Sequence, residues 1–132
     1  MDIRQLKQYW LELSDYDLET AHAMLDTKRY LYVGFMAHQS VEKALKAYYV
    51  SRIAKEAPYT HDLWRLSEVS GLKDTLTEDS ADLLDELQPL NIEARYPRDK
   101  QYIMDELTED YCRRLLEKTV EVQSWIKQMC CG

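Results

Sequence analysis

The sequence predicts an all-α protein, an up-and-down helical bundle of four main helices plus one short helix. Only three glycines and three prolines occur among the 132 residues, so few tight turns are available. Leu, Ala, Glu, Lys and Asp dominate the stretches between these breakers, a composition typical of helices. Apolar residues recur at intervals of three and four, which is the period of an amphipathic helix. The length suits one hydrophobic core, so we expect residues 1–132 to form a single domain.

The first helix is expected from about Asp2 to Asp26, because one apolar track runs through this segment. Asp17 falls on that track, so it lies either at an edge of the bundle or against a partner. The connection Thr27-Lys28-Arg29 is short and predicts that the next helix returns antiparallel. The track consists of Leu6, Trp10, Leu13, Ala21 and Met24.

A second helix is expected from about Tyr30 to Ile53, and its pattern predicts a place at the centre of the bundle. Roughly half of its circumference is apolar or small, which is wider than the stripe of an ordinary surface helix. Such a helix needs neighbours on two sides. The apolar arc contains Val33, Ala37, Val41, Ala44, Leu45 and Tyr48. The opposite arc carries a polar ridge, which we define as Gln39, Glu42, Lys43 and Lys46.

The polar ridge has two interpretations, which differ in what covers it. In the first it is a solvated face, where Glu42 and Lys46 form an i,i+4 pair worth ~0.3–0.5 kcal/mol. In the second, its amide, carboxylate and two ammonium groups form part of a binding site for a charged ligand.

A short third helix is expected from about His61 to Ser70, ended by a glycine. Thr60 is the predicted N-cap, and Tyr59 and Trp64 then occupy the two positions of a hydrophobic staple. His61 has either a structural role at the corner before this helix or a role in an active site.

The remaining chain is predicted to form two main helices joined by a loop. The segment Thr75-Leu76-Thr77-Glu78 fits a capping box and opens a helix that Pro89 kinks or breaks. The stretch from Tyr96 to Leu107 is charged and is expected to be a loop. The last helix is expected from a cap at Thr108 to about Met129.

The charge distribution restricts the class of partner. A net charge of −7 at pH 7 disfavours sequence-independent binding to long nucleic acid, which depends on neutralising phosphates. Between Lys28 and Glu56, however, six basic residues stand against two acidic ones, whereas residues 74–93 hold seven acidic residues and no Lys or Arg. A local positive site fits a nucleotide, a short RNA end or an acidic patch on a partner.

Several kinds of site and location are disfavoured. No apolar run approaches the ~18–20 residues of a transmembrane helix and the N-terminus lacks a signal-peptide core, so we expect a cytoplasmic protein. Three cysteines do not make a disulfide framework. The histidines His22, His38 and His61 are isolated from one another and no Cys pair has metal-ligand spacing, so no metal or other cofactor is predicted. Gly-rich phosphate loops and hydrolase nucleophile motifs are absent.

Three motifs follow one another along the chain: Phe35-x-Ala37-x-Gln39-x-x-Glu42-Lys43-Ala44-Leu45-Lys46, Thr60-His61-Asp62-Leu63 and Arg95-Tyr96-Pro97. Together with Trp10 and Ala21, they resemble the HEPN domain family over nearly the whole chain. This resemblance implies a small helical bundle that dimerises, is associated with nucleotide or RNA chemistry and often has a nucleotidyltransferase partner. The implied nucleotide- or phosphate-binding residues are Gln39, Glu42, Lys43, Lys46, His61, Arg95 and Tyr96.

The resemblance also bears on catalysis. HEPN ribonucleases carry an arginine and a histidine separated by four to six residues, and the histidine moves a proton during attack by the 2′-hydroxyl. The corresponding positions after Arg95 hold Lys100, Gln101 and Tyr102, and no His follows His61. Lys and Tyr side chains titrate near ~10, so neither replaces an imidazole at neutral pH. The resemblance therefore implies a HEPN domain of the Arg-Tyr-Pro kind without nuclease activity.

Three functions remain open. The first is a non-catalytic, nucleotide-binding accessory subunit of a nucleotidyltransferase partner, in a system like the two-component toxin–antitoxin pairs. The second is an RNA endonuclease in which Arg95 works with a displaced base, either His61 or His38. The third is a dimeric helical adaptor. We expect a homodimer, because ten tyrosines and three tryptophans exceed what one small core hides.

Overall fold

The computed structural model describes residues 1–94 and 96–131, and this part of the chain forms the all-α bundle that the sequence predicts. The α-helices are α1 (Ile3–Asp26), α2 (Tyr30–Ile53), α3 (Leu63–Ser70), α4 (Glu78–Leu87), α5 (Pro97–Glu106) and α6 (Glu109–Cys131). Short 3-10 turns lie between α3 and α5, at Leu72–Thr75, Gln88–Leu90 and Ile92–Ala94. Over the described ranges, no helix is long and apolar enough to cross a membrane.

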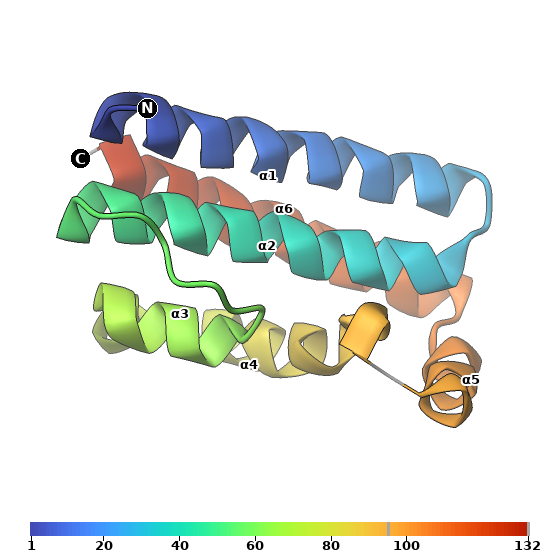
Figure 1. Cartoon of the computed structure of the whole chain (residues 1–132). Helices are drawn as coiled ribbons and strands as arrows, with labels where there is room; N and C mark the ends of the chain where they lie inside the picture. Colours follow the sequence, from blue (N-terminus) through green and yellow to red (C-terminus); the bar gives the residue numbers. More distant parts are fainter. Residues whose placement is uncertain (95, 132) are drawn as a thin grey trace.

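Helix α2 lies at the centre of the bundle, as its wide apolar arc predicts. It contacts α1, α6 and α3 most extensively, and it also contacts α4 and α5. In Figure 1, α1 runs antiparallel along one side of α2, α6 lies behind them, and α3 and α4 cover the other side. Helix α5 lies at the end of the bundle away from the two chain termini (Figure 1).

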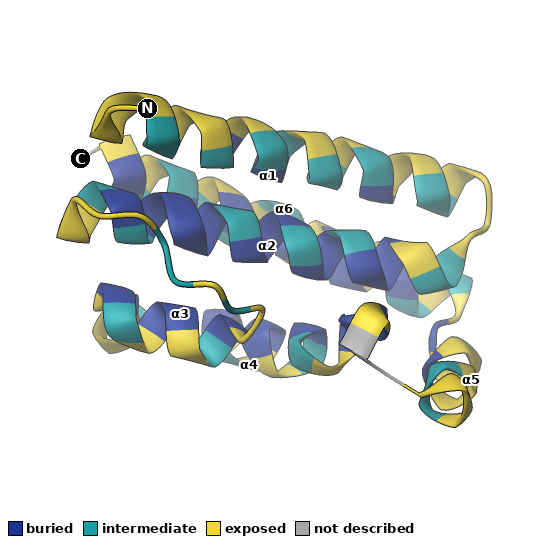
Figure 2. Ribbon diagram, in the orientation of Figure 1, coloured by how far each residue is buried: buried dark blue, intermediate teal, exposed yellow. Residues whose placement is uncertain are grey.

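The middle of α2 is mostly buried, whereas residues near its two ends are exposed (Figure 2). Every residue of the predicted apolar arc is at most 5% exposed. Helices α1 and α2 approach each other through a pair of small residues. Ser14 Oγ donates to the Ser40 carbonyl oxygen at 2.7 Å, and Ser40 Oγ donates to the Ser14 carbonyl oxygen at 2.9 Å. Each buried hydroxyl group therefore has a hydrogen-bond acceptor on the other helix, and neither needs a water molecule.

Helices α1 and α6 begin at caps close to the predicted positions. Asp2 caps α1: its side chain accepts from Gln5 N at 2.8 Å, and the Gln5 side chain accepts from Asp2 N at 3.0 Å. This reciprocal pair is a capping box. At the start of α6, Thr108 Oγ1 accepts from Tyr111 N at 3.2 Å.

The start of α3 differs from the prediction. Its N-cap is Asp62, whose side chain accepts from Arg65 N at 3.1 Å. Thr60 Oγ1 accepts instead from Asp62 N at 3.1 Å, so the threonine stabilises the turn that leads into the cap. The predicted Tyr59–Trp64 staple is wrong, because Tyr59 is fully exposed and the Trp64 indole N–H donates to α4 at 2.9 Å.

The start of α4 is also shifted. Thr77 is the N-cap and Ser80 closes the capping box, instead of the predicted pair at the ends of Thr75-Leu76-Thr77-Glu78. The effect predicted for Pro89 is confirmed, because α4 ends at Leu87 and the chain continues as the 3-10 turn Gln88–Leu90.

Helix α5 occupies most of the stretch from Tyr96 to Leu107, for which the sequence predicts a loop, so that prediction is wrong. Pro97 is the first helical residue, where its fixed φ angle suits a helix and its missing N–H is not needed. Ile103 and Leu107, four residues apart, are buried against the core, whereas Arg98, Asp105 and Glu106 are exposed. A Cβ atom added to Gly34 on α2 would lie 3.3 Å from Leu107 Cδ1, so this glycine lets the end of α5 pack closely.

Candidate functional site

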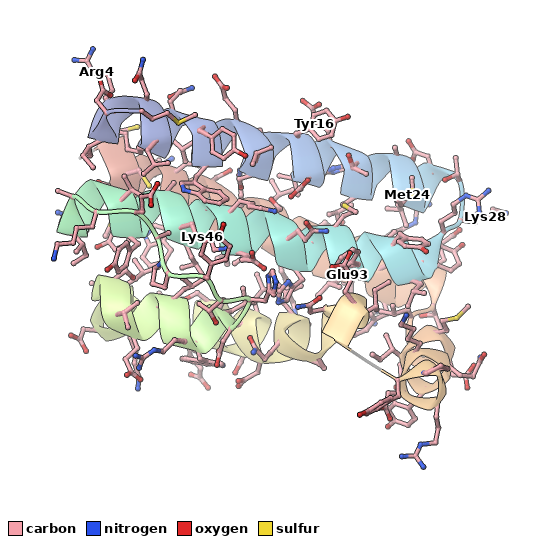
Figure 3. All side chains as sticks on the ribbon, viewed as in Figure 1. Arg4, Tyr16, Met24, Lys28, Lys46 and Glu93 are labelled. Atoms are coloured by element: carbon pink, nitrogen blue, oxygen red, sulfur yellow. The ribbon has the colours of Figure 1, made fainter. Side chains whose placement is uncertain are left out.

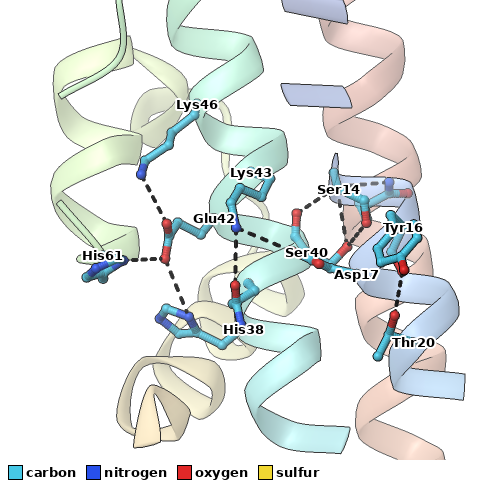
Figure 4. A network of polar contacts seen from close by, with 12 residues as sticks. Ser14, Tyr16, Asp17, Thr20, His38, Ser40, Glu42, Lys43, Lys46 and His61 are labelled. Carbon is cyan, nitrogen blue, oxygen red and sulfur yellow. Dashed lines mark hydrogen bonds and ion pairs between the residues drawn. The ribbon is translucent and has the colours of Figure 1, made fainter. Parts of the chain in front are cut away.

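One polar side of α2 faces the segment that joins α2 to α3. His38, Glu42 and Lys46 follow one another at four-residue intervals, so they share a face of the helix. They are 0%, 2% and 7% exposed, respectively. His61, from the segment before α3, meets this face at Glu42 (Figure 4). We call these four residues the Glu42 cluster.

Both carboxylate oxygens of Glu42 are engaged. Lys46 Nζ donates to Oε2 at 3.0 Å, and His61 Nδ1 lies 3.0 Å from Oε1. An ionised carboxylate only accepts hydrogen bonds, so His61 Nδ1 carries the proton in this contact. His38 Nδ1 lies 3.8 Å from the same Oε1, which is too far for a hydrogen bond.

His61 is the exposed member of the Glu42 cluster. Its side chain is 67% exposed, whereas the Glu42 side chain is 3% exposed. Because Glu42 holds the proton on Nδ1, the other ring nitrogen, Nε2, is an acceptor in the neutral ring and a donor in the protonated ring. Within the described part of the chain, Nε2 has no hydrogen-bond partner. The arrangement can therefore exchange a proton at Nε2, or donate from it to an anion.

His38 is the neutral member of the Glu42 cluster. In residues 1–94 and 96–131 neither ring nitrogen makes a hydrogen bond of good geometry, although the backbone of His61 lies close enough to act toward a higher pKa of His38. Burial lowers the pKa of His38 from its usual 6.5 to about 4, although the carboxylate of Glu42 opposes this shift. The positive charges of His61 and Lys43 add to the lowering. The 3.8 Å contact with Glu42 is therefore not an ion pair at neutral pH.

Acidification is expected to destabilise the fold through His38. The unfolded chain takes up this proton near pH 6.5 and the folded chain only near pH 4, so the unfolded state binds more protons in between. Stability should therefore fall as the pH drops from about 6.5 to about 4, by up to ~3 kcal/mol. Urea unfolding at several pH values measures this slope, and His38→Gln should reduce it.

The matched control for this experiment is His22→Gln, because His22 is exposed on α1. Carboxylates also titrate between about pH 4 and about pH 6.5 and contribute to the pH dependence of stability. The informative quantity is therefore the difference between each variant and the parent protein in the slope of unfolding free energy against pH. Equal slopes for His38→Gln and the parent would show that His38 is not held neutral by burial.

Lys46 connects the Glu42 cluster to a small pocket. Its Nζ lies 5.1 Å from the centroid of the Trp10 ring, a cation–π contact. The pocket beside it has a volume of about 180 Å³. It is lined by Leu6, Trp10, Lys46, Glu56, Ala57, Pro58 and Tyr59.

The structure divides the predicted polar ridge into two parts. Lys43 Nζ donates to Asp17 Oδ2 on α1 at 3.3 Å and to Gln39 Oε1 at 3.2 Å, so these residues face α1. Asp17 therefore has a partner within the chain; burial raises its pKa and Lys43 opposes the shift. Glu42 and Lys46 face the opposite direction. Both are buried, so the solvated interpretation is wrong for them.

The third motif is only partly described. Arg95, the expected phosphate ligand, lies outside the described residues. Tyr96 is the N-cap of α5 and is 76% exposed. Lys100, Gln101 and Tyr102, at the positions where a HEPN ribonuclease would carry its histidine, all lie on α5.

The expectation that the three histidines are isolated from one another is wrong for two of them. His38 and His61 approach the same Glu42 oxygen, at 3.8 and 3.0 Å. The spacing of His38, Glu42 and Lys46 was a usable signal, since residues four apart share a helix face. The position of His61 depends on how the chain folds back after α2. Among the described residues, no group of three His, Cys, Asp or Glu could hold a metal ion.

Comparisons with known proteins agree with this architecture. The crystal structure of TT1696 from Thermus thermophilus superposes with a TM-score of 0.74 over 93% of this chain and 97% of that chain. The two sequences are 20% identical, so this similarity concerns the fold alone. A comparison with curated proteins finds no match. The sequence model of the HEPN domain matches residues 7–129, nearly the full length. The chain therefore belongs to the HEPN domain family.

Proposed function

We propose that this protein is a non-catalytic accessory subunit that binds a nucleotide or a short RNA end and works with a nucleotidyltransferase partner. The observation that carries the proposal is the exposed His61 imidazole, whose Nδ1 is held at 3.0 Å by the buried carboxylate of Glu42. A ring oriented by a carboxylate presents its second nitrogen to a ligand in a fixed direction.

The charge of the Glu42 cluster favours a phosphate group as the ligand. Glu42 and Lys46 cancel each other, and His38 is neutral. When His61 is protonated, the cluster therefore carries one net positive charge on its exposed member. A phosphate oxygen can accept a charge-assisted hydrogen bond from Nε2. The net charge of −7 favours a small phosphate compound over long nucleic acid.

Phosphate compounds are expected to bind weakly, and His61→Ala and Arg95→Ala should each weaken binding about tenfold, because each removes a charge-assisted hydrogen bond. Isothermal titration calorimetry with adenosine 5′-monophosphate and ribose 5-phosphate measures this effect. His22→Ala, on the exposed part of α1, is the matched control and should bind as the parent does. If the phosphate compounds produce no heat of binding and no thermal stabilisation of the parent protein, the proposal is wrong.

The second candidate is an RNA endonuclease, and one observation favours it. A carboxylate that orients an imidazole is the arrangement that general bases use, so His61 Nε2 could take the proton of a 2′-hydroxyl. We nevertheless expect no cleavage of single-stranded RNA, because the positions after Arg95 lack a histidine. Robust cleavage that disappears in both His61→Ala and Arg95→Ala would establish the endonuclease instead.

The proposal includes a two-fold symmetric homodimer. Large apolar and aromatic side chains are exposed on several elements, among them Tyr9, Tyr16, Tyr32, Tyr59, Tyr96 and Tyr102. Tyr16 projects outward from α1 (Figure 3) and is 67% exposed. A symmetric pairing is the commonest way to cover such surface. Sedimentation velocity at micromolar concentration should show the dimer; a monomer would contradict it.

The accessory subunit and a simple helical adaptor differ in their partner. A toxin–antitoxin-like system requires a nucleotidyltransferase that acts together with this chain, so such a protein should be encoded beside it. An adaptor would have the same fold and dimer but would not bind phosphate compounds at His61.

A further inference from the structure

We propose that the pocket beside Lys46 binds an unpaired pyrimidine base, presented by the ligand whose phosphate meets His61. This inference rests on the proposed function and names the ligand more closely. The pocket lies where Leu6 and Trp10 of α1, Lys46 of α2 and the segment Glu56–Tyr59 come together. Lys46 belongs both to this pocket and to the Glu42 cluster, so the two subsites adjoin each other.

Lys46 has hydrogen-bond donors to spare. Its ammonium group has three N–H donors, and the side chain is only 9% exposed. One donor is used by Glu42 at 3.0 Å, and the centroid of the Trp10 ring lies 5.1 Å from Nζ. Within the described residues no second acceptor reaches Nζ. A buried ammonium with a single hydrogen bond favours a ligand that brings an acceptor.

An acceptor that meets Lys46 Nζ in this pocket should be neutral. The charge of Lys46 is already neutralised by Glu42, so an anion in the pocket would add an unpaired negative charge to a buried ion pair. A neutral carbonyl oxygen satisfies Nζ without this cost. Pyrimidine bases carry such a carbonyl beside the ribose attachment, whereas adenine has no carbonyl group.

The pocket has the size and lining that suit a single aromatic ring. Its other walls are mostly apolar and partly aromatic, with Leu6, Trp10, Ala57 and Pro58 around the space and the carboxylate residue Glu56 beside them. Its volume of about 180 Å³ is below the ~300–1,000 Å³ of sites that enclose a whole small molecule. A single ring therefore fits, and the sugar and phosphate remain outside. Tyr59 is fully exposed at the edge of the pocket and is free to stack on the ring.

Calorimetric titration with three phosphates tests the inference. Uridine 5′-monophosphate should bind about tenfold more tightly than ribose 5-phosphate, because its base adds a hydrogen bond to Lys46 Nζ and a stacking contact inside the pocket. Adenosine 5′-monophosphate should bind no more tightly than ribose 5-phosphate, because a two-ring base does not fit a pocket of about 180 Å³ and so neither contact forms. Tyr59→Ala should abolish the advantage of the uridine compound and leave ribose 5-phosphate unchanged. Tyr16→Ala, which removes another exposed tyrosine, is the matched control.

Two further compounds, the nucleosides uridine and adenosine without phosphate, separate this inference from the proposed function. If uridine binds more tightly than adenosine but ribose 5-phosphate does not bind, the result supports the base pocket and contradicts the phosphate site at His61. If all three phosphates bind equally and Tyr59→Ala changes nothing, the phosphate site stands and the base pocket is wrong. A preference for adenosine over uridine would also contradict the assignment of a pyrimidine base to this pocket. A complete lack of selectivity would contradict it too, and would fit a pocket that holds an apolar segment of a protein partner.

Because Tyr59 is fully exposed, its substitution leaves the fold intact and keeps the test interpretable. Trp10→Phe provides a second variant that retains an aromatic wall but removes the larger ring. It should reduce the preference for uridine over adenosine at least severalfold, since stacking depends on ring area. An unchanged preference in both variants would contradict the assignment of the base to this pocket.

Discussion

Glu42→Gln is expected to lower the free energy of unfolding by roughly 3–5 kcal/mol, the cost of leaving one member of a buried ion pair unpaired. Glu42 is 2% exposed and its two carboxylate oxygens contact Lys46 and His61. Glutamine has nearly the same shape, so the loss would come from charge and not from a cavity. Urea unfolding followed by circular dichroism measures the change.

The double variant Glu42→Gln with Lys46→Met should recover much of this loss, because no buried charge then lacks a partner. Glu68→Gln is the surface control: Glu68 pairs with Arg65 at 3.5 Å, and both side chains are more than half exposed. Its cost should stay below ~1 kcal/mol. If Glu42→Gln costs no more than Glu68→Gln, the buried pair is not a structural element of this fold.

Ala44→Glu is expected to destabilise the bundle by at least ~4 kcal/mol, enough to unfold a domain of ordinary stability. Ala44 is 0% exposed and lies in the middle of the buried arc of α2. A glutamate there has neither space nor a partner for its charge. Loss of the cooperative thermal transition in circular dichroism is the expected result.

Lys43→Glu, one residue earlier, is the matched comparison and should leave the protein folded. Lys43 pairs with Asp17 at 3.3 Å in a partly exposed place, so the reversed charge should cost ~1–2 kcal/mol by repulsion. Equal losses in Ala44→Glu and Lys43→Glu would mean that the assigned orientation of α2 about its axis is wrong.

The bundle could be predicted from the sequence because helix periodicity is a local signal. The apolar arc of α2 repeats at helical spacing, and its residues are buried as predicted. Helix α5 is not predicted because it has a single buried apolar residue, Ile103, in a sequence rich in charged residues; Leu107 follows just after the helix ends. The start of α3 was misplaced because Thr60 and Asp62 are both good N-caps, and the choice between them depends on tertiary contacts.

The candidate site can be predicted from the sequence less completely than the fold. The Glu42–Lys46 pair followed from its spacing, but its burial did not, because an i,i+4 pair looks the same whether or not another element covers it. The cover comes from the segment after α2, which brings His61 to Glu42. The neutral state of His38 likewise depends on burial, which no local pattern indicates.

The central claim is that His61, held by Glu42, is the group that meets phosphate. The most direct measurement is nuclear magnetic resonance of the imidazole nitrogens during titration with ribose 5-phosphate. His22, His38 and His61 are the three histidines of the chain, so few signals need assignment. We predict that the His61 Nε2 signal shifts and saturates, that added salt reverses the shift, and that His22 does not move. An unchanged His61 signal at saturating ligand, or equal shifts of His22 and His61, would contradict the claim.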